Sequence, residues 1–484
     1  MTTATTILNY VGGRFVEPHS RAHLENVEPA TGRPYSLLPD SDERDVGQAY
    51  DAAHLAFRDW SRTPAAERSR VMLRIADLID ANHDRLAEAE SIDTGKPISL
   101  ARAVDIPRAA ANFRFFATAI LHTESEAYAT DDVALNVTLR APRGVAGLIS
   151  PWNLPLYLLT WKVAPAIATG NTAVAKPSEV TPMTAFLLCR LCDEAGLPPG
   201  VLNVVHGFGP KVGAAVVDHP GIPAISFTGG TATGAAIAAS AAPMLKKLSL
   251  ELGGKNPYVV FADADLDDAL ETGVRAAFTN QGQICLCGSR MLIERPAYDD
   301  FVAGLVERAK ARRIGDPLDP ATEHGALVSR AHLDKVRGAI ARAAEEGGEI
   351  LGGGRRPEGL PERCAEGFFL EPTVIAGLGP HCRTNQEEIF GPLVTVQPFD
   401  DEDEAIALAN DVPYGLAASV WTGDGRRAMR MAEAIDAGTV WVNCWMLRDL
   451  RAPFGGMKAS GVGREGGTEA IRFFTEPKNV CLKR

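Results

Sequence analysis

The alternation of short β-rich runs with helix-length segments between Arg140 and Glu251 is the feature that most limits how this chain can fold. Five runs end in Gly, Pro or Ser and are separated by segments with the length of helices; they are GVAGLIS, NTAVAKP, LNVVHG, AISFTGG and KKLSLELGG. Parallel strands need such helical crossovers, whereas antiparallel strands can be joined by tight turns. The pattern therefore predicts an α/β fold with a doubly wound, Rossmann-type parallel sheet.

The rest of the chain adds a second α/β series and several smaller elements. Helices are expected near residues 262–279, 297–311, 330–346 and 402–410, within an alternating region from Asn256 to Phe454. Residues 1–40 have the turn residues of short strands. Apolar side chains at helical spacing predict one amphipathic helix through Val71 and Leu86, and a second helix over DIPRAAANFRFFATAIL. Residues 122–139 are polar and indicate a connector or an excursion, and FFTEPKNVCLKR is strand-like.

Composition limits the partners and the cellular compartment. The 484 residues, 46% of them apolar, are enough for two or three domains. The net charge of -12 argues against nucleic acid or an anionic membrane as a partner, which leaves small polar metabolites. Eight scattered cysteines lack the spacing of a disulfide framework and favour a reducing cytoplasm. The beginning, MTTATTILNYVGGRF, is unlike a signal peptide, and prolines interrupt the longest apolar region.

Two thiols lie in the polar segment FTNQGQICLCGSR. Buried structural cysteines usually lie among aliphatic residues, but Gly282 and Gln283 come just before Ile284 and Cys285. A tight turn there would leave the Cys285 sulfur facing a cavity, as a nucleophile requires. The alternative is that Cys285 and Cys287 are unreactive loop thiols.

Four predicted strand ends carry groups suited to ligands, which bind such sheets at the carboxyl ends of the strands. Asn153 could donate to an oxyanion, and Lys176 with Glu179 could hold ribose hydroxyls. The run FTGG opens a helix whose free N–H groups suit a pyrophosphate, and Glu251 precedes a glycine pair. Taken singly, each group has a structural alternative as a turn residue, an ion pair or a cap.

Seven motifs in order resemble the NAD(P)-dependent aldehyde dehydrogenase superfamily over nearly the whole chain: SPWNLPL, KPSEVTP, FTGGTATG, LELGGKNP, NQGQICLCGSR, EEIFGPL and PFGGMKASGVGRE. The resemblance implies a dinucleotide-binding domain (residues 1–121 and 140–252), an α/β catalytic domain (253–460) and a small β oligomerisation domain (122–139 and 470–484). A homodimer or homotetramer is implied as well. The chain departs from the family pattern at Gly230, where Ser is frequent, and at Cys287, where a small residue is frequent.

The same resemblance implies the roles of the site residues. Cys285 attacks the aldehyde carbon, Asn153 and the Cys285 N–H hold the oxyanion, hydride leaves for the nicotinamide, and Glu251 activates the water that hydrolyses the thioester. NAD is the expected cofactor, because Glu179 would repel the 2′-phosphate of NADP. The expected cofactor-binding residues are Ile149, Ser150, Pro151, Trp152, Lys176, Ser178, Glu179, Gly209, Gly213, Phe227, Thr228, Gly229, Gly230, Leu252, Glu388 and Phe390.

Two further patterns are set aside as ligand motifs. The run from Gly207 to Gly213 is one residue too long for a dinucleotide fingerprint, and the resemblance puts it at the adenine end. Cys189 and Cys192 form a CxxC inside a helical apolar pattern without a second pair, so core packing is favoured over zinc, and no metal site is expected.

Two arginines bear on the substrate. By resemblance, Arg108 and Arg448 border the substrate tunnel, and a guanidinium pair would select an aldehyde with a distant carboxylate. The strings ISPWNLPLYLLTWK and NCWMLRDLR resemble the branch of the family that oxidises 2-aminomuconate and 2-hydroxymuconate 6-semialdehydes. Three alternatives stay open: surface arginines in an enzyme for succinate semialdehyde or of broad specificity, a CoA-acylating enzyme, which Glu251 disfavours, and a binding protein without turnover.

Overall fold

The computed structural model describes residues 5–484, and its largest element is a mixed sheet of eight strands. Five of these strands are parallel and neighbour one another in the order β12-β11-β8-β9-β10. They are β8 (Val145–Ile149), β9 (Thr172–Lys176), β10 (Leu202–Val204), β11 (Ala224–Thr228) and β12 (Lys247–Glu251). All five coincide with the predicted runs, so the doubly wound parallel sheet is confirmed.

Three antiparallel strands extend this sheet, and the periodicity had not assigned them to it. β2 (Asn9–Val11) pairs with β10, β3 (Arg14–Val16) pairs with β2, and β22 (Gly461–Val462) pairs with β12 at the opposite edge. The β22 contact brings the end of the chain back beside Glu251, since Gly461 is paired with that residue.

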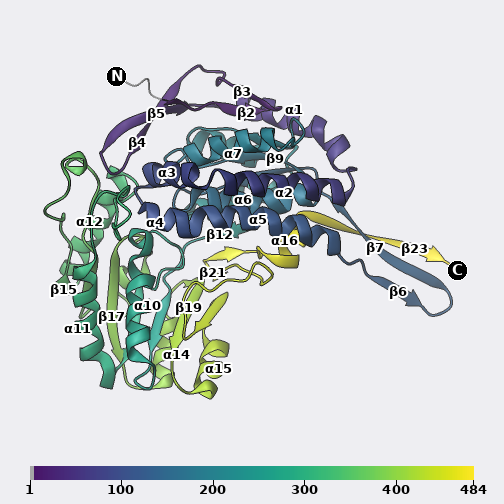
Figure 1. Ribbon diagram of the computed structural model, residues 1–484. Helices are drawn as coiled ribbons and strands as arrows, with labels where there is room; N and C mark the ends of the chain where they lie inside the picture. Colours follow the sequence, from purple (N-terminus) through teal and green to yellow (C-terminus); the bar gives the residue numbers. More distant parts are fainter. Residues whose placement is uncertain (1–4) are drawn as a thin grey trace.

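Helices cover the faces of this sheet (Figure 1). They are α1 (Glu43–Trp60), α2 (Ala65–Ala81), α3 (His83–Thr94), α4 (Ile98–Leu100), α5 (Ile106–Ala119), α6 (Pro155–Ala168), α7 (Met183–Glu194), α8 (Ala214–Asp218), α9 (Thr231–Ala241) and α16 (Gly467–Phe473). The predicted single helix through Val71 and Leu86 is two helices, because the chain turns at Asn82 between α2 and α3.

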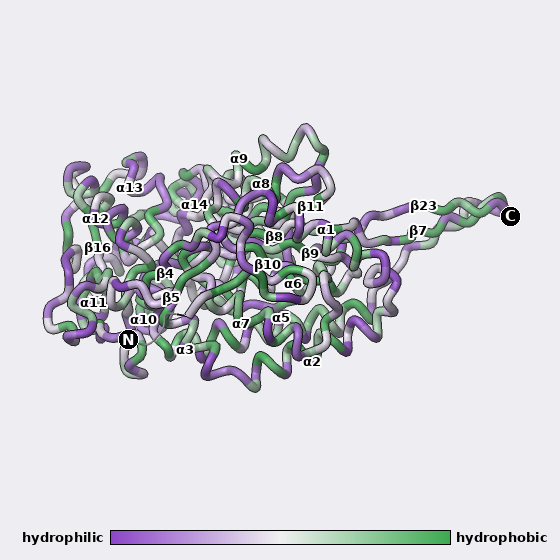
Figure 2. Tube along the Cα trace, turned by 90° about the horizontal axis from the view of Figure 1, so that it is seen from above, coloured by the Kyte–Doolittle hydropathy of each residue, from purple (hydrophilic) through white to green (hydrophobic). Residues whose placement is uncertain are grey.

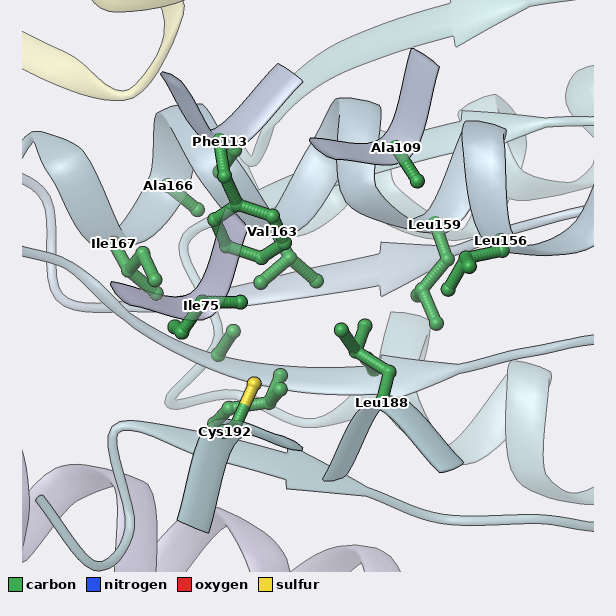
Figure 3. Close-up of a cluster of buried hydrophobic side chains, with 14 of the residues drawn as sticks. Ile75, Ala109, Phe113, Leu156, Leu159, Val163, Ala166, Ile167, Leu188 and Cys192 are labelled. Carbon is green, nitrogen blue, oxygen red and sulfur yellow. The ribbon is translucent and has the colours of Figure 1, made fainter. Parts of the chain in front are cut away.

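The main hydrophobic core lies between α2, α5, α6, α7 and the sheet. Figure 3 shows Ile75, Phe113 and Val163 packed together, with Leu188 and Cys192 of α7 on the other side of the strands. Every residue of α6 is buried, so this helix is enclosed between the sheet and α5. That enclosure gives the side chains on the first turn of α6 a rigid base.

A second sheet of seven strands stands beside the first (Figure 1). Its order is β15 (Glu349–Gly352), β16 (Thr373–Ala376), β17 (Leu393–Phe399), β14 (Arg290–Glu294), β13 (Pro257–Val260), β19 (Ala417–Trp421) and β20 (Thr439–Val442). Its helices are α10 (Leu266–Phe278), α11 (Arg295–Ala311), α12 (Arg330–Glu345), α13 (Arg383–Gln386), α14 (Glu402–Asn410) and α15 (Gly425–Ala434). The second α/β series is thus confirmed.

A three-stranded arm projects from the body of the molecule (Figures 1 and 2). The expected connector is the hairpin of β6 (Ala127–Thr130) and β7 (Ala134–Pro142), and β7 pairs along its length with β23 (Thr475–Lys483). The remaining strands are β1 (Thr5–Thr6), β4 (His23–Glu28) and β5 (Arg33–Pro39) in one small sheet, and β18 (Tyr414–Gly415) and β21 (Met457–Lys458) in another.

Candidate active site

Two neighbouring cavities lie at the carboxyl ends of the parallel strands of the eight-stranded sheet. The larger has a volume of about 750 Å³ and the smaller, which contains Cys285, about 230 Å³. Their common lining consists of Pro151, Trp152, Thr228, Gly229 and Gly230. Segments attached to the second sheet close the smaller cavity, so the site forms between the two sheets.

The sixteen residues expected to hold the cofactor all line these two cavities. Thirteen of them surround the larger cavity: Ile149, Ser150, Pro151, Trp152, Lys176, Ser178, Glu179, Gly209, Gly213, Phe227, Thr228, Gly229 and Gly230. Leu252, Glu388 and Phe390 line the smaller cavity together with Asn153 and Cys285. Residues far apart in the chain are thereby brought to one place, as the strand-end argument requires.

The larger cavity has the groups that a dinucleotide needs. Helix α9 begins at its edge after Gly230, with no side chain capping its first N–H groups, so these can receive a phosphate. Lys176 Nζ lies 2.5 Å from the Glu179 carboxylate at the opposite end, where ribose hydroxyls could bind. The buried Ser150 and Thr228 hydroxyls have no partner within residues 5–484. Volume, phosphate site and unpartnered hydroxyls therefore fit a nicotinamide dinucleotide.

Three consecutive left-handed residues shape the loop that precedes Cys285. The φ angles are 53° at Asn280, 55° at Gln281 and 69° at Gly282. A Cβ atom at Gly282 would lie 2.1 Å from the carbonyl oxygen of Gly391, so only glycine fits there. The tight turn expected from the glycine is present, and the two residues before it share its unusual conformation.

Asn256 and Trp445 hold the loop from behind, and the sequence had not identified either residue. The Asn256 side chain donates to the carbonyl oxygens of Cys285 (2.7 Å) and Cys287 (2.8 Å) and accepts from the Ala417 N–H. The Trp445 indole donates to the Leu286 carbonyl at 2.9 Å. A buried polar residue at the start of an apolar strand was the available signal for Asn256.

Cys285 is half-buried and its thiol is weakly acidic here. Burial raises its pKa to about 12, the negative charges of Glu388 and Glu251 raise it further, and the positive charge of Arg448 opposes them. In this state the sulfur carries its proton at neutral pH. A nucleophilic role therefore requires that a nearby base remove the proton.

Glu251 is the nearby carboxylate, at the end of β12. It is fully buried, and in the described chain neither of its oxygens has a hydrogen-bond partner. Burial and the charge of Glu465 raise its pKa well above the ordinary value, while Lys162 and Arg448 lower it. Lys162 Nζ lies 2.8 Å from Glu465, so a second buried ionisable pair adjoins Glu251. A carboxyl with a raised pKa is a suitable proton acceptor near neutral pH.

Asn153 lies across the loop from these groups. Its side-chain nitrogen donates to the Gln283 carbonyl at 2.9 Å, and Asn280 donates to the Asn153 carbonyl at 3.1 Å. An amide nitrogen carries two hydrogens, so one remains for an oxyanion while the other fixes the side chain. Asn153, Glu251 and Cys285 thus lie around a common space, although Glu251 lines the narrower cavity of about 20 Å³ behind Cys285.

Arg448 and Arg108 approach each other at the far end of that narrow cavity. Arg448 Nη1 donates to the Tyr157 hydroxyl at 3.1 Å, and its guanidinium lies 3.8 Å from the centre of the Phe454 ring. The Arg108 guanidinium lies 5.3 Å from the Tyr157 ring and 5.4 Å from the Trp161 ring. Arg448 lines the cavity, whereas Arg108 contacts two aromatic rings that line it.

Neither arginine is neutralised. Within residues 5–484 neither forms a salt bridge, and Arg108 Nε and Nη2 are buried without a hydrogen-bond partner. Asp449, the nearest acidic residue in sequence, is instead paired with Arg451 at 2.6 Å. Burial and the charge of Arg448 lower the pKa of Arg108. The expectation of surface arginines in ion pairs is therefore wrong for both residues.

Comparison with known proteins matches this architecture to one family. The model of the aldehyde dehydrogenase family matches residues 15–480. The chain belongs to the aldehyde dehydrogenase family. It is therefore an enzyme of the oxidoreductase class that acts on aldehydes, and the fold expected from the motifs is confirmed.

Individual relatives match over almost the whole of both chains. The chain is 52% identical to a 2-aminomuconic semialdehyde dehydrogenase of Danio rerio, with 98% of each chain covered. It is 48% identical to a 2-hydroxymuconic semialdehyde dehydrogenase of Pseudomonas sp. (strain CF600), with 99% of each covered. The NAD+ complex of an aldehyde dehydrogenase from Bacillus cereus superposes with a TM-score of 0.96 at 38% identity, covering 99% of this chain and 96% of that one.

The two departures from the aldehyde dehydrogenase pattern have different surroundings. Gly230 precedes α9 at the cavity edge, where its backbone stays available. Cys287 is buried in the core of the second sheet, and burial raises its pKa to about 12. All eight cysteines of this aldehyde dehydrogenase are free.

Two residues of the smaller cavity had not been predicted, His332 and Lys335 of α12. His332 Nε2 donates to the Phe390 carbonyl at 2.7 Å, and its ring lies 5.0 Å from Trp152. Burial lowers the His332 pKa to about 4, so the imidazole is neutral. His332 therefore fixes the left-handed Phe390, whose φ is 65°.

The two patterns that had been set aside behave as core and lining. Cys189 and Cys192 are fully buried in α7, and Figure 3 shows Cys192 among aliphatic side chains. Across residues 5–484 no cluster of three His, Cys, Asp or Glu side chains could hold a metal ion. Gly209 and Gly213 bound a π-helical turn at the larger cavity. None of the helices in the described residues is both long and apolar enough to cross a membrane.

Proposed function

We propose that this aldehyde dehydrogenase oxidises 2-aminomuconate or 2-hydroxymuconate 6-semialdehyde to the dicarboxylate, with NAD as the cofactor. The observation that carries the proposal is the pair of unneutralised arginines, Arg108 and Arg448, beyond Cys285. The names of the relatives at 52% and 48% identity support the same substrate class.

The arginine pair supplies the recognition of the carboxylate. A buried cation without an anion is unfavourable, so two adjacent ones favour a ligand that brings negative charge. Guanidinium groups bind carboxylates through parallel N–H donors. A conjugated semialdehyde with a carboxylate at its far end would place its aldehyde at Cys285. The narrow cavity of about 20 Å³ must widen for this, by movement of the flexible Met446 and Arg448 side chains that line it.

The proposed chemistry begins at Cys285. The ionised fraction of Glu251 takes the thiol proton, and the thiolate attacks the aldehyde carbon. The free Asn153 amide hydrogen and the Cys285 N–H stabilise the resulting oxyanion. When bound, the nicotinamide supplies the acceptor for the hydride that leaves this carbon. Cys285 is then a thioester, and Glu251 deprotonates the water that releases the carboxylate product and the thiolate.

The preference for NAD over NADP rests on Glu179. Its carboxylate lines the larger cavity beside Lys176, where a 2′-phosphate would meet negative charge. Glu179→Gln should raise kcat/KM for NADP relative to NAD, whereas the exposed Glu194→Gln on α7 should leave the ratio unchanged. A wild-type enzyme with the higher kcat/KM for NADP would overturn this part of the proposal.

The arm supports assembly into a homodimer or homotetramer. Tyr128, Val133, Leu139 and Leu482 expose large apolar side chains on it, which a second copy could cover. A monomer in sedimentation velocity at micromolar concentration would refute this. We also infer a cytoplasmic location, because eight free cysteines suit a reducing compartment.

The substrate assignment is tested by kcat/KM for enzymatically generated 2-hydroxymuconate semialdehyde, succinate semialdehyde and an uncharged aromatic aldehyde. Arg448→Ala should lower kcat/KM for the muconate compound about 10- to 150-fold, since hydrogen bonds to charged groups contribute about 1.5–3 kcal/mol. The uncharged aldehyde should be almost unaffected. Arg451→Ala, in the same loop but paired with Asp449, is the matched control.

The alternative is an enzyme for another semialdehyde, such as succinate semialdehyde, or one of broad specificity. Comparable wild-type kcat/KM values for all three aldehydes would favour broad specificity. Equal losses on the charged and the uncharged substrate in Arg448→Ala would remove the carboxylate-binding argument.

A further inference from the structure

Tyr157 connects the two arginines. It lies in the first turn of α6, is 3% exposed, and lines the narrow cavity with Cys285. Its hydroxyl oxygen accepts from Arg448 Nη1 at 3.1 Å, and its ring lies 5.3 Å from the Arg108 guanidinium carbon. One side chain thus contacts the residues from α5 and from the loop after β20 that the proposed function assigns to the substrate carboxylate.

We propose that Tyr157 is a specificity-determining positioning residue, which holds Arg448 by its hydroxyl and Arg108 by its ring so that both guanidinium groups face one substrate carboxylate. The inference rests on the proposed function and adds the group that arranges its arginines. Tyr157 is not needed for the attack of Cys285 on an aldehyde without a carboxylate.

The type of contact explains why an aromatic hydroxyl suits this position. An acidic side chain would hold an arginine more strongly, but it would use the N–H donors and neutralise the charge that the substrate needs. The ring attracts Arg108 through its face and uses none of its donors. The hydroxyl uses one of the five N–H donors of Arg448. Both arginines therefore stay charged, with donors available.

Like charges must also be kept together against their repulsion. The Arg448 charge acts on Arg108 and lowers its pKa. Aromatic contacts offset part of this cost: Arg448 lies over Phe454 at 3.8 Å, and both arginines lie over Trp161, at 5.4 and 5.8 Å. Tyr157 differs from Phe454 and Trp161 because it contacts both guanidinium groups and also forms a hydrogen bond.

The backbone of Tyr157 is held to the helix that carries Arg108. Asn112, one turn after Arg108 on α5, donates to the Tyr157 carbonyl at 3.1 Å and to the Thr160 hydroxyl at 3.0 Å. Thr160 also donates to the Tyr157 carbonyl at 2.9 Å. Asn112 and Thr160 are fully buried. These bonds fix the start of α6 against α5, so the distance between the Tyr157 ring and Arg108 is set by the fold.

Tyr157→Phe tests the proposal because it removes the hydroxyl and keeps the ring. We expect KM for 2-hydroxymuconate semialdehyde to rise about tenfold with kcat nearly unchanged, since one hydrogen bond to a charged group is lost. KM for an uncharged aromatic aldehyde and the thermal midpoint should stay as in the wild type. Tyr157→Leu removes both contacts and should raise KM for the charged substrate further. Adipate, a saturated dicarboxylate, should inhibit Tyr157→Phe more weakly.

A double-mutant cycle separates positioning from a general structural effect. If Tyr157 acts through Arg448, the loss caused by Arg448→Ala should be smaller in the Tyr157→Phe background than in the wild type. Additive losses would refute the inference. So would an unchanged KM for the charged substrate in Tyr157→Phe while Arg448→Ala still discriminates, an outcome that leaves the proposed function intact. If Arg448→Ala fails to discriminate, the proposed function falls, and this inference falls with it.

Discussion

Replacing Asn256 by Ala should separate the placement of the nucleophile from the stability of the fold. Asn256 is 4% exposed and bridges three backbone groups: the carbonyls of Cys285 and Cys287 and the N–H of Ala417. The substitution leaves these groups without their side-chain partner. A buried polar group without a partner costs about 1–3 kcal/mol, so the total is about 3 to 6 kcal/mol where water does not enter.

The effect on rate comes from the position of the sulfur. With both carbonyls released, only the Trp445 contact to Leu286 still holds this side of the loop. A displacement of about 1 Å costs about 100-fold in rate, so kcat with an uncharged aromatic aldehyde should fall by about that factor. The NADH burst in a single turnover should slow equally, because the attack itself is impaired.

Asn410→Ala is the matched control. Asn410 also bridges a backbone carbonyl, that of Ala434, and a backbone N–H, that of Asp436, each at 2.8 Å, but it lies on α14 away from Cys285. Its loss should lower the thermal midpoint and leave kcat within about threefold of the wild type. Equal losses of kcat in both variants, or a folded Asn256→Ala with nearly normal kcat, would refute the reasoning.

Three further outcomes follow from the site. Because the pKa of Cys285 is raised to about 12, its thiolate fraction is small at pH 7, and alkylation by iodoacetamide should accelerate about tenfold per pH unit from pH 6 to 10; a plateau below pH 8 would contradict this. Gly455→Ala would put a Cβ atom 2.7 Å from Glu251 Oε1, so steady-state turnover should fall about 100-fold, while Gly425→Ala, with open space around it, should not change it. Gly282→Ala should abolish activity by a clash with the Gly391 carbonyl and a φ of 69°, whereas Gly338→Ala inside α12 should stabilise the protein by about 0.5–1 kcal/mol, and a fully active Gly282→Ala would show that the loop can rearrange.

The local elements and their order could be predicted from the sequence. Five parallel strands, the helices between them and the second α/β series follow from apolar periodicity and from Gly and Pro at their ends. The positions of Asn153, Glu179 and Glu251 at strand ends were also predictable, because parallel strands joined by crossovers end at the same edge of a sheet.

Only the tertiary structure decided which distant segments meet. β2 and β22 join opposite edges of the first sheet, and β23 pairs with β7 from the other end of the chain. Periodicity reports which face of an element is buried and carries no information about its partner. For the same reason, residues 122–139 were expected as a connector, although their strands pair with the last strand of the chain.

The site shows the same division. The chain order of the motifs determined the family, the nucleophile and the cofactor lining, because these depend on short runs of sequence. The bridge from Asn256 to Cys285 and the meeting of Arg108 with Arg448 over Tyr157 were decided by packing. Helices α5 and α6 and the loop after β20 are brought together by the burial of apolar faces across two sheets, and that burial is a property of the whole folded chain rather than of any one segment.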